Sequence, residues 1–194
     1  MKKTIATGAA VVATALIVSS VGAAAPKPKL PKRWTGTAVY THTYQGDDGS
    51  MQQTVNAAVV LVPAKGWRGT YQVSSGTIKS NYTQTTSDGC TVTSSGSYPA
   101  SKYLLTLQVS ASPRPRASFS AQEGAVSAPV PATTTCPDGT SFTSEIGVEN
   151  PFFMVGRHTA GFPVKASLTR ISGSLRTAQD GGVWTVRFSF VGKK

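Results

Sequence analysis

The sequence predicts an all-β protein, a single domain built as an antiparallel β-sandwich or flattened barrel with one disulfide. Three observations support this fold class. Turn signals recur about every ten residues, which is the spacing expected of short strands. Apolar and polar residues alternate in the stretches between those signals. Beyond the N-terminal segment no apolar period of about 3.6 residues appears, so helices are not expected.

The N-terminal segment has the three parts of a secretory signal peptide. Two lysines precede an apolar run from Ile5 to Val18, and small residues follow it, which is the order of the charged, hydrophobic and cleavage regions. We expect cleavage after Ala23 or Ala24 and assign residues 1–24 to the signal. A retained membrane anchor is the alternative, disfavoured because the run is mostly Ala, Gly, Ser and Thr. The pattern is typical of bacteria and predicts a secreted, periplasmic or cell-envelope location, with no transmembrane segment left after cleavage.

Residues 25–33 are expected to form an extended basic tether. Its PKPKLPK run (26–32) alternates proline with lysine, which excludes a helix and keeps the chain extended by charge repulsion. Removing the signal leaves 17 basic against 8 acidic residues, so the net charge falls from +11 to +9. Such a charge predicts attraction to anionic envelope polymers or a membrane surface. The other basic residues are scattered along the chain, and the tether holds the cluster Lys27, Lys29, Lys32 and Arg33.

Residues 34–192 are expected to form the β domain. The turn signals that divide it are Gly46-Asp47-Asp48-Gly49, Ala64-Lys65-Gly66, Ser74-Ser75-Gly76, Ser87-Asp88-Gly89, Pro137-Asp138-Gly139 and Asp180-Gly181-Gly182. An Asp-Gly pair between alternating strands indicates a hairpin, because both residues tolerate positive φ. The strands with the clearest alternation have their apolar side chains at Tyr103, Leu105, Leu107 and Val109, and at Trp184, Val186, Phe188 and Phe190.

The stretch from Gln122 to Phe162 departs from this pattern. It is rich in proline, and a further proline, Pro163, follows directly. We therefore expect a long irregular connection, fixed by Cys136. Long loops inside compact domains usually carry function or are disordered.

The two cysteines, Cys90 and Cys136, are expected to pair in an oxidising compartment. The alternative of a zinc or redox site fails on ligand number and spacing, since only two histidines are added. No metal and no cofactor is predicted.

Four residues are candidates for a functional site. His42 alternates in register with Trp34, Tyr40 and Tyr44, so it should share a face with these three aromatic residues, and a partly buried structural role is favoured over catalysis. Glu145 and Glu149 would lie on one side of an extended segment, where a carboxylate pair suits glycoside hydrolysis. His158 falls in the irregular region. No nucleophile motif accompanies these residues.

The sequence therefore favours a non-enzymatic binding or structural domain of the bacterial envelope or exterior, and we expect a monomer. Two alternatives stay open: a secreted hydrolase acting on polysaccharide, and a secreted inhibitor that uses the 122–162 loop. Nucleic acid is not an expected partner, because no recognition signature is present.

Overall fold

In a computed structural model, the described part of the chain forms one antiparallel sheet of 11 strands. The structure describes residues 29–102, 105–110, 114–121, 127–149, 152, 155, 162–163 and 168–194. A short 3-10 turn, η1 (Ala100–Lys102), follows β4. The strands are β1 (Arg33–Gly46), β2 (Gly49–Pro63), β3 (Thr70–Thr86), β4 (Thr91–Pro99), β5 (Leu105–Ser110), β6 (Arg116–Ala121), β7 (Ser127–Thr135), β8 (Ser141–Glu149), β9 (Phe162–Pro163), β10 (Arg170–Gln179) and β11 (Gly182–Lys193). The fold class predicted from the sequence is therefore confirmed.

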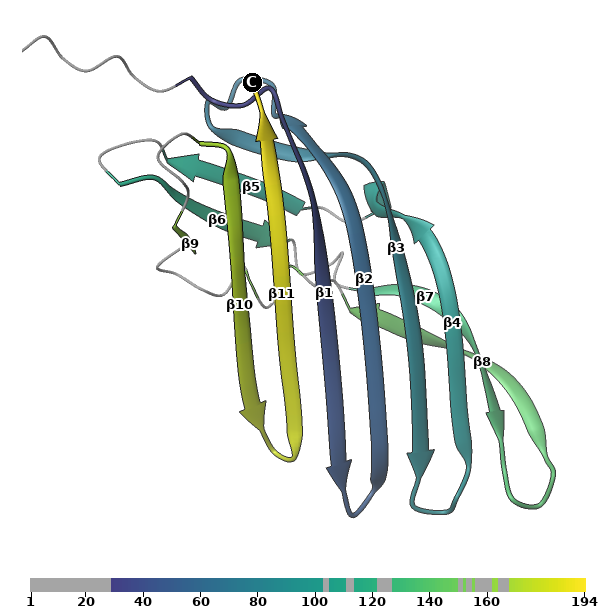
Figure 1. Cartoon of the computed structure of the whole chain (residues 1–194). Coiled ribbons are helices and arrows are strands. Elements are labelled where there is room, and N and C mark those ends of the chain that lie inside the picture. The colour runs from purple at the N-terminus through teal and green to yellow at the C-terminus, as the bar shows by residue number, and fades with distance from the viewer. Residues whose placement is uncertain are drawn as a thin grey trace, which may run out of the picture.

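Long neighbouring strands form the main part of the sheet (Figure 1). Their order is β10-β11-β1-β2-β3-β4-β7-β8, with β5 paired to β3, β6 to β5 and β9 to β6. The hairpins predicted at the Asp-Gly turns are confirmed for β1–β2, β3–β4, β7–β8 and β10–β11. Within the described residues, no helix is long and apolar enough to cross a membrane.

A β-bulge in β3 lets this strand change its neighbour. The β2–β3 register shifts between Val60 and Leu61, and the hydroxyl of the extra residue, Ser74, donates a hydrogen bond to the Val60 carbonyl at 3.2 Å. Before the bulge β3 pairs with β5, and after it β3 pairs with β4. The turn predicted at Ser74-Ser75-Gly76 is therefore wrong, because its glycine and serines serve a bulge inside one strand.

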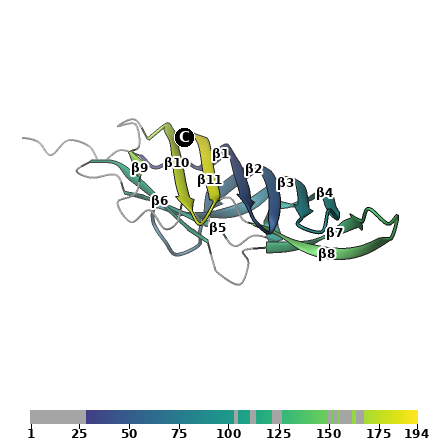
Figure 2. The same cartoon turned by 90° about the horizontal axis from the view of Figure 1, so that it is seen from below.

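The second layer lies against one face of the main strands. Figures 1 and 2 show β5 and β6 behind β10, β11 and β1, and β7 and β8 behind β4. At the centre, the Phe119 ring of β6 lies 5.1 Å from Phe188 and 5.5 Å from Phe190, between ring centroids. Leu105, Leu107, Val109, Val186, Phe188 and Phe190 are all buried, as the alternation predicts.

The irregular connection predicted from Gln122 to Phe162 is wrong for residues 127–149, which form the β7–β8 hairpin. The prolines of β7 are compatible with a strand because of their position. The Pro131 carbonyl accepts a hydrogen bond from the Ser94 hydroxyl of β4 at 2.5 Å, so the missing N–H of Pro131 faces β4 and not β8. The backbone pairing of β4 with β7 stops at Thr133, and no ladder bond is lost at Pro131.

Candidate functional site

His42 lies on the inner face of β1, as the alternation predicts. Trp34 and Tyr40 on the same face are fully buried, and Tyr44 is half-buried. The His42 ring stacks on Trp184 of β11, with 4.4 Å between centroids and 22° between planes. His42 is thus part of an aromatic surface that extends the core.

Of the other sequence candidates, the structure describes the side chain of Glu145 alone, and it lies on a different strand from His42. Glu145 is exposed on β8, and Glu149 ends the same strand. In the order of hydrogen-bonded strands, β2, β3, β4 and β7 stand between β1 and β8. His158 and the Glu149 side chain lie outside the described residues. Among the residues that the structure describes, no group of three or more His, Cys, Asp or Glu could hold a metal ion.

The disulfide is formed as predicted, between Cys90 and Cys136. It joins the turn after β3 to the end of β7, where β4 and β7 share only the pairs from Thr91 to Thr93. The cross-link therefore reinforces the short junction between the main strands and the β7–β8 hairpin.

All aspartates of the chain lie at one end of the sheet, which we call the acidic end. They occupy the turns of four hairpins, and the pairing register places these turns side by side: Gly46 with Gly49, Gly49 with Thr86, Tyr44 with Gly182, and Thr91 with Thr135. The residues are Asp47, Asp48, Asp88, Asp138 and Asp180.

Two of these aspartates hold their own turns. The pKa of Asp88 is lowered by hydrogen bonds from the Thr86 hydroxyl and the Cys90 amide. The pKa of Asp138 is lowered by the Thr140 hydroxyl and amide, at 2.7 and 2.9 Å. Hydrogen bonds donated to a carboxylate favour its charged form. Both side chains are therefore negative at neutral pH.

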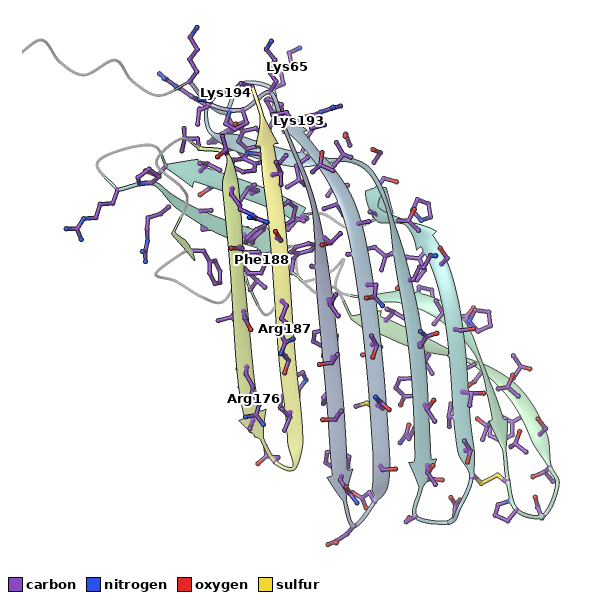
Figure 3. All side chains as sticks on the ribbon, viewed as in Figure 1. Lys65, Arg176, Arg187, Phe188, Lys193 and Lys194 are labelled. Carbon is purple, nitrogen blue, oxygen red and sulfur yellow. A yellow bond between two sulfur atoms is a disulfide. The ribbon has the colours of Figure 1, made fainter. Side chains whose placement is uncertain are left out.

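Basic residues gather at the opposite end, which we call the basic end. The chain enters the sheet there: the Lys32 amide donates to the Lys193 carbonyl at 2.7 Å, and Arg33 pairs with Lys193. Figure 3 shows Lys65, Lys193 and Lys194 together at this end. The basic end consists of Lys29, Lys32, Arg33, Lys65, Arg68, Lys193 and Lys194.

An exposed tryptophan stands among these cations. Trp67 lies in the loop between β2 and β3 and is 72 % exposed. The loop backbone is fixed by hydrogen bonds: the Trp67 amide donates to the Ala64 carbonyl, and the Thr70 amide to the Trp67 carbonyl, each at 3.2 Å. The indole is therefore presented to solvent by a hydrogen-bonded loop.

A hollow of about 550 Å³ opens beside Trp67. Its apolar lining includes Leu30, Pro31 and Tyr71, and its charged lining includes Lys32 and Arg68. The Tyr71 hydroxyl donates to the Pro31 carbonyl at 2.8 Å. This hydrogen bond fastens the entering chain to the sheet, and burial raises the pKa of Tyr71 further above its ordinary value.

The described part of the tether, Lys29 to Arg33, belongs to the basic end, and Lys27 lies outside the described residues. Sequence reasoning missed Lys65, Trp67 and the C-terminal lysines, because they are far apart along the chain. The sequence did contain one signal for Trp67. It lies beside a predicted turn and not at an alternating strand position, which favours an exposed side chain.

Comparison with known proteins gives no relative. No protein-family model, curated protein or solved structure matches the chain.

Proposed function

We propose that the protein is a non-enzymatic binding domain of the bacterial cell envelope, exported by its N-terminal signal and attached to an anionic surface through the basic end. The observation that carries this proposal is the separation of charge. The aspartates lie in the hairpin turns of the acidic end, and the clustered lysines and arginines lie at the opposite end.

The two ends are far enough apart for the aspartates to have little effect on an anionic surface that binds the basic end. Strand β1 has 14 residues, so at about 3.3 Å per residue the ends are about 45 Å apart. The Debye length at physiological ionic strength is about 8 Å. An anionic surface at the basic end therefore interacts with the lysines while the aspartates, several Debye lengths away, repel it little.

Several further features support this role. The basic end is formed by chain segments that begin and end strands, so it is carried on the rigid sheet. The disulfide fits an oxidising compartment outside the cytoplasm. His42 is stacked on Trp184 in the aromatic inner face, which fits the structural role expected of it.

The proposal is tested by sedimenting the protein that begins after Ala24 with isolated cell envelopes at low and high salt. Retention should be strong at low salt and decline steeply as salt screens the lysines. Retention that is unaffected by salt would point to a specific uncharged ligand and would contradict the proposal. Absence from the pellet at every salt concentration would reject envelope attachment altogether.

A further inference from the structure

The loop between β2 and β3 carries an exposed aromatic side chain, Trp67, close in sequence to cations of the basic end. Lys65 and Arg68 flank Trp67 in the sequence, and Trp67 is 72 % exposed although the loop that carries it is hydrogen-bonded. One exposed apolar side chain is common on protein surfaces, so the contact surface is inferred from Trp67 together with the apolar hollow beside it and the cations around it. Phe142, an exposed aromatic residue at the acidic end, lies near the start of β8, just after the turn that holds Asp138.

The hollow beside Trp67 is lined by both apolar and cationic residues. Leu30, Pro31 and Tyr71 contribute apolar surface, while Lys32 and Arg68 contribute charge. Lys65, Lys193 and Lys194 surround the same end (Figure 3). A hydrated anionic polymer would form ion pairs with the cations, but it would offer no apolar surface to the indole and the hollow. An anionic bilayer offers both phosphate groups and an apolar layer beneath them.

We propose that the basic end docks on the surface of an anionic phospholipid bilayer, with the Trp67 indole at the headgroup–acyl boundary and the surrounding lysines and arginines on the lipid phosphates. This inference rests on the proposed function and names its partner. Tryptophan is enriched at membrane interfaces, and the attraction of basic residues to an anionic leaflet adds to the contribution of buried apolar surface. The sheet then stands away from the membrane and presents its acidic turns outward.

The test uses lipid vesicles and the emission of Trp67. The protein beginning after Ala24 is titrated with phosphatidylglycerol-containing vesicles and with neutral phosphatidylcholine vesicles. Binding to the anionic vesicles should shift the tryptophan emission to shorter wavelength, and Trp67→Phe should abolish that shift. Trp34 is fully buried and Trp184 is stacked on His42, so neither should respond.

Affinity for the vesicles gives a second readout. Trp67→Ala should weaken it about tenfold, the effect of withdrawing about a third of the indole surface from the interface. Phe142→Ala is the matched control at the acidic end and should leave vesicle affinity unchanged. Both side chains are exposed, so both variants should keep the unfolding midpoint of the parent protein.

The outcomes separate this inference from the proposed function. The proposed contact between Trp67 and lipid is wrong if the protein binds vesicles without an emission shift. It is also wrong if Trp67→Ala binds them as tightly as the parent protein. Stronger retention on lipid-free polyglycerol phosphate than on vesicles also overturns it, and envelope attachment through the lysines then stands. If the protein does not sediment with whole envelopes in a salt-sensitive way, the proposed function itself is wrong.

Discussion

Replacing both cysteines by serine should loosen the β7–β8 hairpin before the rest of the sheet. The hairpin meets the main strands through three residue pairs between β4 and β7, from Thr91 to Thr93. The disulfide crosses the same junction. Further attachment comes from the hydrogen bond of the Ser94 hydroxyl to the Pro131 carbonyl and from the packing of buried side chains such as Val130 and Val148.

The size of the effect follows from the loop that the disulfide closes. Cys90 and Cys136 are separated by 46 residues, and the chain-entropy relation gives about 4 kcal/mol for a loop of this length. This value is an upper limit for the loss of global stability, because the reduced chain keeps its other contacts. We expect a loss of about 2–4 kcal/mol in the free energy of unfolding.

Urea denaturation of the double variant and the parent protein measures the global loss, and native-state hydrogen exchange shows its location. Amides of β7 and β8 should open at a lower free energy than those of β1 and β2, which have paired strands on both sides. Equal destabilisation of all strands, or a loss below about 1 kcal/mol, would refute the view that the disulfide secures this junction.

Three further predictions concern the core and the turns. Phe119→Ala should lower the free energy of unfolding by about 3–5 kcal/mol, measured by urea denaturation, because Phe119 contacts several aromatic rings at the centre of the core. Gly173→Ala should cost about 1–3 kcal/mol in the same assay, since the added Cβ would meet the Phe188 ring at 2.5 Å; an unchanged midpoint would show that the ring moves freely. The stabilisation from Asp88 and Asp138 should be complete above about pH 4 and decline as the pH falls through their lowered pKa values, because protonation weakens the bonds from Thr86 and Thr140. Faster amide exchange of Cys90 and Thr140 in acid, relative to intrinsic rates, would report this change, and its absence would contradict the assignment.

Much of the fold follows from local patterns in the sequence. The alternation in 184–190 placed Val186, Phe188 and Phe190 in the core, because a period of two can satisfy only one buried face. The Asp-Gly turns placed the hairpins, because positive φ is required there: Asp180 and Gly181 both adopt it. These signals depend on neighbouring residues alone.

The errors arose where the local signal is ambiguous. A glycine among serines at Gly76 suits a turn and a bulge equally well, and only the change of partner from β5 to β4 decides between them. Proline at Pro131 argues against a strand unless its nitrogen faces an unpaired side, which depends on where β4 and β7 separate. Both features are set by tertiary structure.

The residues of the basic end are far apart in the sequence, but their position at one end of the sheet could have been predicted from it. In an antiparallel meander, successive connections alternate between the two ends of the sheet. The Asp-rich turns fall at one end, and the Lys65–Arg68 loop, the start of β1 and the end of β11 fall at the other. Counting connections along the chain would have brought Lys32, Lys65 and Lys193 together.

The most direct test of the account compares two triple variants of equal charge in sedimentation with isolated envelopes at low salt. Lys65→Gln, Lys193→Gln and Lys194→Gln remove charge from the basic end. Lys79→Gln, Arg176→Gln and Arg187→Gln remove the same charge from exposed strand positions. We predict that the first variant loses most of its retention, and that the second stays close to the parent protein. Equal losses in the two variants would show that net charge alone governs attachment, and would contradict a binding role for the basic end.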